Sequence, residues 1–247
     1  HMDEYNVSIT DDEKAAITAA AAQFMEDNSK DAINALGATQ EIVEEYLTLE
    51  TIQSKMKAAI VAGADTNVTD EEAKTGAYSY VGISKTTHQD ESGNTVDYTD
   101  EEKEELAAKV ADFAKAAKED GLDAAAEDAG YTVSTGTFTQ EDDSVDDNLL
   151  AALKNLKEGE VTDLIDGDSS YFVARLDKEV DEDATEETRQ SIIEQRKDDL
   201  YDETLDGWKE GIEWAVKEKV WDDVNFDNLF TTIKDTETES TTEQATE

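Results

Sequence analysis

Apolar residues recur every three or four positions in the first part of the chain, and this spacing predicts amphipathic helices. After Thr10, one helical face carries Ile17, Ala20, Ala21, Phe24 and Met25. After Thr39, a second face carries Ile42, Tyr46, Leu49, Ile52, Met56 and Ile60. We therefore expect a helical N-terminal region that ends near Gly63.

Threonines mark where several helices begin. Thr10, Thr69 and Thr99 are each followed three residues later by glutamate. In this capping box the two side chains satisfy backbone N–H groups that have no partner in the first turn. Thr39, just after Gly37, is expected to cap a fourth helix.

The pattern changes to that of a β-strand at AYSYVGIS, residues 77–84, which are rich in aromatic and β-branched side chains. This change predicts a domain boundary near residue 76. A polar loop is expected at 88–99. The helix predicted after it has an apolar face made of Leu106, Val110, Phe113, Ala114 and Ala117.

Shorter elements are expected after that helix. Gly121 is a suitable residue to end it, and Gly130 to end a second, smaller helix. Residues 131–133 are expected to form a strand, and 136–138 to continue into a turn. Another helix is expected around 147–156.

A β-hairpin is predicted where GEVTDLI (159–165) and SSYFVARL (169–176) flank a turn rich in aspartate and glycine. One face of the second strand would carry Phe172, Ala174 and Leu176, and the other Tyr171, Val173 and Arg175. Together these elements predict a compact α+β domain.

Helical spacing returns after this domain, at Ile192, Ile193, Leu200, Trp208 and Ile212. Such a helix must bury its apolar face, and the N-terminal helices are the simplest partner. We therefore predict an α+β domain (76–180) inserted between two halves (3–75 and 181–233) of one helical domain. Residues 234–247 are acidic and lack large apolar groups, which predicts a disordered tail.

The charge of the chain limits its partners. Lys and Arg total 21 and Asp and Glu total 64, a formal net charge of −43. We expect no binding to nucleic acid or to an anionic membrane surface, because both would be repelled.

Familiar catalytic patterns are missing from the sequence. It contains no cysteine, no P-loop, no Rossmann glycine motif, no HExxH and no G-x-S-x-G. No cofactor, no metal and no catalytic residue is assigned. His1 and Met2 are interpreted as vector-derived, which leaves His88, expected to be a solvated loop residue rather than a base or ligand.

Several short stretches resemble the parvulin-type peptidyl-prolyl isomerases, and the whole chain resembles the PrsA/SurA-like extracytoplasmic foldases of bacteria. The stretches are VTDEEAK, AYSYVGIS, TGTFT, LKEGEVTDLI, SYFVARLDK and the C-terminal GWKEGIEWAVKEKVWDDVNF. The resemblance implies a helical chaperone domain, assembled from N- and C-terminal segments, that carries an inserted parvulin-like domain.

The resemblance also implies a substrate pocket, with one departure. Phe138, Val145 and Leu149 match apolar pocket positions, and Tyr80 and Phe172 are added as substrate-binding candidates. Active parvulins usually carry one histidine in the first strand and another in the last. This chain has no histidine in AYSYVGIS, and Phe172 stands at the second position.

We therefore expect a folding factor that binds unfolded or exported polypeptides and has weak or no prolyl isomerase activity. One alternative is an active isomerase that uses Tyr80 or Tyr171. Another is an acidic surface protein that binds calcium through 141–147 or 163–168.

The resemblance implies a location outside the cytoplasm, either secreted or on the outer face of the membrane. Any membrane contact would be through a lipid anchor that lies outside this sequence. Whether the chain forms a homodimer, and which proteins it helps to fold, is left open.

Overall fold

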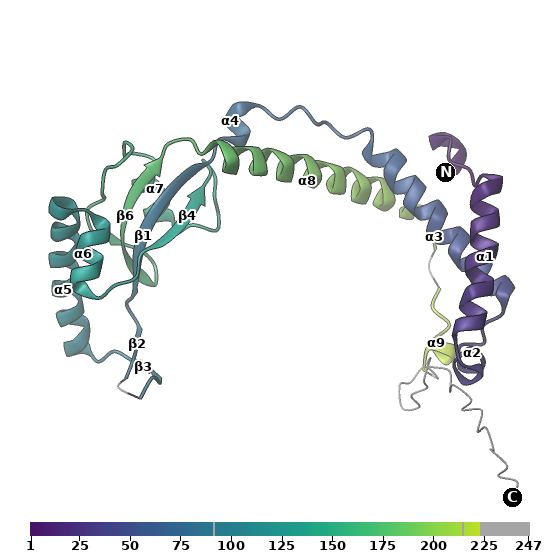
Figure 1. The fold of residues 1–247 in the computed structure, drawn as a ribbon, viewed down its shortest axis with the longest axis horizontal. Helices are drawn as coiled ribbons and strands as arrows, with labels where there is room; N and C mark the ends of the chain where they lie inside the picture. Colours follow the sequence, from purple (N-terminus) through teal and green to yellow (C-terminus); the bar gives the residue numbers. More distant parts are fainter. Residues whose placement is uncertain (91, 214, 223–247) are drawn as a thin grey trace, which may run out of the picture. The chain divides into compact units, whose positions relative to one another are not determined.

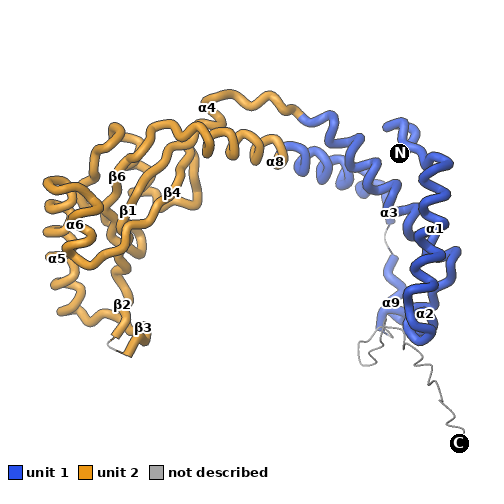
Figure 2. Tube along the Cα trace, in the orientation of Figure 1, with its two compact units in different colours: residues 1–64, 196–247 blue, residues 65–195 orange. Residues whose placement is uncertain are grey.

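The computed structural model describes residues 1–90, 92–213 and 215–222. The chain divides into two compact units, His1–Ala64 with Arg196–Glu247 and Asp65–Gln195 (Figure 2). The predicted α+β class is confirmed, since unit 2 combines helices with an antiparallel sheet. The predicted tail (234–247) and the end of the predicted C-terminal helical segment (223–233) lie outside the described residues.

Unit 1 is built from helices. In chain order these are η1 Met2–Tyr5, α1 Asp11–Asp27, α2 Lys30–Leu36, α3 Gln40–Val61, the second part of α8 Glu182–Lys209, and α9 Glu218–Trp221. Thr10 and Glu13 form the predicted capping box at α1, and Thr39 caps α3. The core contains Val7, Met56 and Ile60, against which Leu200 and Trp208 of α8 pack.

The helix predicted to reach Ile212 ends earlier. Helix α8 ends at Lys209, so the prediction of helical register at Ile212 is wrong. Gly207 and Gly211 flank this end, and glycine destabilises a helix because its unfolded backbone has more freedom to lose.

Unit 2 contains a four-stranded sheet in the order β4-β1-β6-β5, with all neighbours antiparallel (Figure 1). Its elements are α4 Asp70–Ala73, β1 Gly76–Ser84, β2 Thr87–Gln89, β3 Thr95–Asp97, α5 Asp100–Asp120, α6 Leu122–Ala129, β4 Ser134–Phe138, α7 Asp147–Leu153, β5 Ile165–Asp166 and β6 Ser170–Lys178. The first part of α8 completes the unit.

Three local predictions need correction. The strand expected at 131–133 lies instead at Ser134–Phe138, where β4 pairs with β1, so 136–138 is not a turn. Tyr131 packs its ring against Phe113 of α5 at 4.9 Å instead. The loop predicted at 88–99 contains a small hairpin of β2 and β3, so His88 is a strand residue.

Unit 2 extends beyond the sheet because the start of α8 is hydrogen-bonded to the segment before β1. The backbone N–H of Thr75 donates to Thr185 Oγ1 at 3.2 Å, and Arg189 donates to the Val68 carbonyl and to Asp70. The boundaries between the two units therefore lie near residues 65 and 195. The predicted domain ranges, with boundaries near residues 76 and 180, stay a prediction.

Different helices cover the two faces of the sheet. On one face, α7 packs against Tyr78 of β1 and against Ala174 and Leu176 of β6. On the other, α5 and α6 pack against Val81 and Val173. This alternation agrees with the two faces predicted for the second hairpin strand.

Candidate functional site

Four aromatic rings form a row on the face of the sheet that α7 covers. Phe138 lies 5.9 Å from Tyr78 between ring centroids, Tyr78 lies 5.4 Å from Tyr80, and Tyr80 lies 6.2 Å from Phe172. We call this set the aromatic row. The rings are tilted or edge-on to one another, the arrangement that aromatic quadrupoles prefer.

Strand register and glycines make room for the row. Gly136 is the partner of Tyr78, and a Cβ atom there would lie 2.8 Å from the Tyr78 ring. Gly82 is the partner of Phe172, and a Cβ atom there would lie 3.2 Å from that ring. A Cβ atom on Gly167 would lie 2.6 Å from the Phe172 ring. Glycine is therefore needed most at 136 and 167, where an added Cβ atom would overlap a ring.

All five predicted substrate-binding residues lie in or against one apolar cluster. Phe138 and Leu149 are 6% and 3% exposed, so these two side chains belong to the core. Tyr80, Val145 and Phe172 are partly buried and pack against the same cluster. The structure thus brings the five together, while their contact with a substrate stays a prediction.

Asp146 links the start of α7 to the turn before Phe172. One carboxylate oxygen accepts from the backbone N–H groups of Asn148 and Leu149, at 3.0 and 3.2 Å. The other accepts from the N–H of Asp168 at 2.9 Å. Burial alone would raise the pKa of Asp146, but these backbone hydrogen bonds stabilise the charged form and hold its pKa below the usual range.

Lys85 also stabilises the turn between β5 and β6. Its ammonium donates to the carboxylate of Asp166 and to the carbonyl oxygen of Gly167. The hydrogen bond to Asp166 raises the pKa of Lys85. Lys85 was not predicted as a site residue from the sequence, and Asp146 was included only in the acidic run 141–147. The sequence could have predicted Asp146 as the N-cap of α7, because aspartate is common just before the first residue of a helix.

The one histidine in the predicted parvulin-like region lies away from the aromatic row. His88 is in β2, outside the four-stranded sheet, and its ring stacks on Tyr98 at 4.5 Å. Its Nε2 atom lies 3.8 Å from a carboxylate oxygen of Glu102. No imidazole therefore lies in the aromatic row, which contains Phe172, the position that the family resemblance assigns to the second histidine.

Tyr171 is separated from the row by the strand alternation. It follows Ser170 in β6 and pairs with Ile83, and its ring lies 5.3 Å from Lys85 Nζ. Phe172, the next residue, packs against the α7-side cluster. Because successive side chains of a strand point to opposite faces, only Tyr80 of the two proposed tyrosines belongs to the row.

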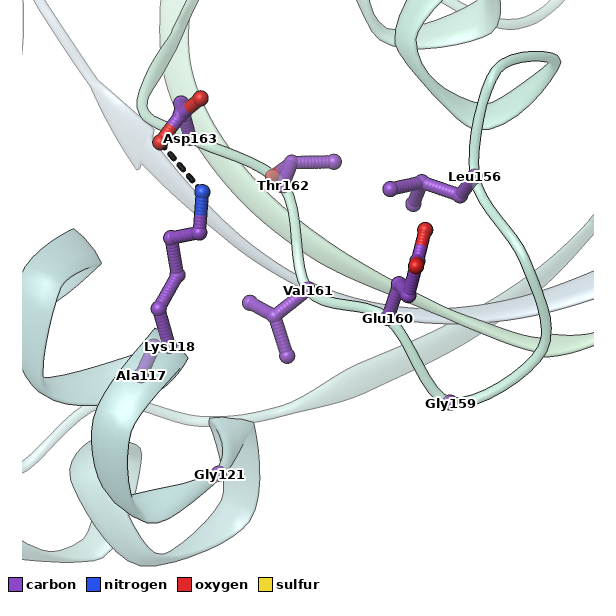
Figure 3. A pocket seen from close by; sticks show the side chains of 9 residues that line it. All are labelled: Ala117, Lys118, Gly121, Leu156, Gly159, Glu160, Val161, Thr162 and Asp163. Atoms are coloured by element: carbon purple, nitrogen blue, oxygen red, sulfur yellow. Dashed lines mark hydrogen bonds and ion pairs between the residues drawn. The ribbon is translucent and has the colours of Figure 1, made fainter.

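Two clefts open near these elements. The larger, about 520 Å³, lies between the α5–α6 junction and the segment leading to β5 (Figure 3). Lys118 and Asp163 form an ion pair of 2.6 Å at its wall, and none of the five predicted residues lines it. The smaller, about 170 Å³, is lined by Phe138 with Leu153, Leu156 and Leu176.

Residues 85–190 match the family model described as PPIC-type PPIASE domain. This segment of the chain is a domain of that family. The resemblance of the central region to parvulins is therefore confirmed. The match includes Phe138, Val145, Leu149 and Phe172, and it begins after the first strand that carries Tyr80.

The chain is also similar to solved structures. PrsA from Bacillus cereus is 19% identical, with 88% of this chain and 80% of that chain covered and a TM-score of 0.37. Foldase protein PrsA from Streptococcus pneumoniae is 20% identical, with 87% and 82% covered and a TM-score of 0.32. A Campylobacter jejuni structure described as SurA-like chaperones is 12% identical, with 86% and 80% covered and a TM-score of 0.30. A search of the curated proteins found no significant match.

Proposed function

We propose that this protein is an extracytoplasmic folding factor that binds unfolded exported polypeptides, and that its PPIC-type domain has weak or no prolyl isomerase activity. The observation that carries the second part is the pairing of Tyr80 with Phe172. The resemblance puts one histidine in the first strand, which has none here and carries Tyr80, and another at the position of Phe172, and these two rings lie 6.2 Å apart between centroids.

The chemistry of the reaction explains why this replacement matters. Rotation about a peptide bond has a barrier of roughly 18–20 kcal/mol, set by amide resonance. A pocket lowers this barrier only if it binds the twisted amide more tightly than the planar one. Apolar rings can hold a proline ring, but Phe172 has no hydrogen-bonding group to stabilise the twisted amide.

A folding factor that binds unfolded chains also needs exposed apolar surface. Leu36, Ile42, Tyr46 and Leu49 of unit 1 are each more than half exposed. Clustered exposed apolar groups of this size are typical of interaction sites. None of the described helices is long and apolar enough to cross a membrane.

Two assays on the full chain test the proposal. The first follows isomerisation of a proline-containing peptide, and we expect a rate close to the uncatalysed one. The second follows aggregation of a reduced, unfolded protein, and we expect suppression at a near-equimolar ratio. Absence of suppression would contradict a folding factor, and isomerisation at the rate of an efficient enzyme would contradict the second part.

The alternative of an active isomerase has one observation in its favour. Tyr80 carries a hydroxyl group, and its ring is partly buried in the aromatic row, 6.2 Å from the Phe172 ring between centroids. A Tyr80→Phe variant separates the two proposals. Activity that is present in the parent chain and falls in this variant would favour the active enzyme.

The calcium alternative is supported less well by the described residues. Asp142 and Asp146 accept hydrogen bonds from backbone N–H groups, and Asp163 and Asp166 pair with lysines. Within the described ranges, no three Asp, Glu, His or Cys side chains gather in a way that would hold a metal ion. A calcium-dependent rise in melting temperature would revive this alternative.

A further inference from the structure

Helix α3 leaves part of its apolar face uncovered. Ile42, Tyr46 and Leu49 are 53%, 59% and 59% exposed. They are spaced four and three residues apart, so they lie on one side of the helix. We call these three residues the α3 stripe. The same side continues into Met56 and Ile60, which are buried in the core of unit 1.

Carboxylates line the α3 stripe. Glu45 comes three residues after Ile42 and four before Leu49, and Glu50 comes four after Tyr46, which places both beside the stripe. Glu41 comes four residues before Glu45 and lies on the same side of the helix as Glu45. The Glu50 carboxylate is close enough to raise the pKa of Tyr46, first by accepting a hydrogen bond from its hydroxyl and then by its charge. The polar border of the stripe is therefore negative.

No cation in the described structure neutralises this border. Residues 31–54 contain no Lys or Arg. The next base along the chain, Lys55, donates to Glu13 at 2.8 Å and to the carbonyl of Ser8. No ion pair among the described residues involves Glu41, Glu45 or Glu50.

We propose that the α3 stripe binds unfolded segments in which lysine or arginine is interleaved with apolar side chains. This inference rests on the proposed function and names the class of polypeptide that the protein holds. Apolar side chains of the segment would cover the stripe. The long stems of Lys or Arg would lie along it while their charged ends reach the carboxylates.

The geometry also favours this occupant over a second copy of the chain. Two stripes facing each other would bring the same carboxylates together, in molecules that each carry a formal charge of −43. From Ile42 to Leu49 the stripe covers seven residue steps of helix, a rise of roughly 10 Å, which an extended segment covers with about three residues. Short apolar-basic runs in an unfolded chain are therefore long enough to bind.

Four fluorescent peptides of equal length provide the test on the full chain. Three share the same apolar residues and carry lysine, serine or glutamate at the positions between them, and the fourth carries lysine with serine in place of the apolar residues. We expect the apolar-lysine peptide to bind at least about tenfold more tightly than the apolar-glutamate peptide at low salt, and this difference to shrink as salt is added.

Two triple variants and a matched control locate the binding. Ile42→Ser with Tyr46→Ser and Leu49→Ser should weaken binding of the apolar-lysine peptide at least about tenfold. Glu41→Gln with Glu45→Gln and Glu50→Gln should lower the affinity for the apolar-lysine peptide until it is close to the affinity of the parent chain for the apolar-serine peptide. The control changes the net charge equally at three exposed α5 positions, Glu101→Gln, Glu104→Gln and Glu119→Gln, and should leave binding nearly unchanged.

The outcomes separate this inference from the proposed function. Equal affinity for the lysine and serine peptides, or an equal effect of the α5 control, would overturn the inference and leave a folding factor without charge preference. A gain of affinity in Trp221→Ser would also overturn it, by showing that the chain's own C-terminal segment occupies the stripe. Failure of all four peptides together with failure to suppress aggregation would reject the proposed function itself.

Discussion

The rings of Tyr80 and Phe172 lie 6.2 Å apart on neighbouring strands of the sheet, on the face covered by α7. Tyr80 comes from the central strand β1, and Phe172 comes from the hairpin strand β6. Both rings are partly buried in the same cluster, so side chains placed at these positions face the same apolar environment. This pairing makes the proposed loss of isomerase activity directly testable.

Replacing both rings with histidine should increase isomerase activity. Histidine is smaller than either ring and supplies a donor and an acceptor. We expect kcat/KM of the Tyr80→His/Phe172→His variant to rise at least about tenfold, equivalent to about 1.4 kcal/mol in the barrier. A protease-coupled or NMR exchange assay on a proline peptide measures this.

The matched control for that experiment is Tyr80→Phe/Phe172→Leu, which changes the same positions without adding hydrogen-bonding groups. It should show no gain. A folded histidine variant without increased activity would contradict the view that the missing imidazoles limit catalysis.

Gly136→Ala should destabilise unit 2. The added Cβ atom would lie 2.8 Å from the Tyr78 ring, which is itself 6% exposed and held by Phe138 at 5.9 Å. Overpacking of this kind costs about 1–3 kcal/mol. Gly82→Ala is the control in the same sheet, since its Cβ atom would lie at the longer distance of 3.2 Å from Phe172, a ring that is only partly buried. Urea unfolding should show a clearly larger loss for Gly136→Ala.

The same contact explains why β4 was misplaced from the sequence. TGTF has glycine between two threonines, a pattern that also suits a turn, and residues 131–133 look more like a strand. The strand forms at Ser134–Phe138 because Gly136 lets β4 pass close to the Tyr78 ring. The contact between Gly136 and Tyr78 joins residues that are far apart in the sequence, so local strand and turn propensities cannot predict it.

Other parts of the fold could be predicted from short stretches of the sequence. The capping boxes at Thr10, Thr69 and Thr99 are present, because they depend only on residues three apart. The hairpin was predicted from its turn, yet its first strand is reduced to Ile165–Asp166, with Val161 forming a single bridge to Arg175. Periodicity also placed Ile42 and Ile60 on one face, but it does not reveal which end of that face is covered.

Asp146→Ala should destabilise α7 and loosen the turn before Phe172. The variant loses the N-cap to Asn148 and Leu149 and the acceptor for the Asp168 N–H. Loss of an N-cap alone costs about 0.5–2 kcal/mol. Asp143→Ala removes the same charge from an exposed neighbour, and it should be nearly neutral in thermal unfolding. Equal effects of the two variants would contradict the role of Asp146.

Acid should remove a specific contribution of Glu13 to the stability of unit 1. Hydrogen bonds from Lys55, and next from the Thr10 backbone, lower the pKa of Glu13 from 4.5 to about 2. A carboxyl whose pKa is lower in the folded state binds fewer protons there than in the unfolded chain. Its stabilising effect is therefore fully present above pH 4.5 and is lost as the pH falls toward 2.

The difference in stability between the parent chain and Glu13→Gln measures this effect. The difference should be constant above about pH 5 and should shrink through the window between pH 4.5 and 2. Lys55→Met should shift the Glu13 titration, followed by NMR of its carboxyl carbon, back toward 4.5, while Lys14→Met should not. Lys14 is a suitable control because it pairs with Asp11 on the same helix and not with Glu13. A Glu13 titration near 4.5 in the parent chain would contradict the contact between α1 and α3 on which this prediction depends.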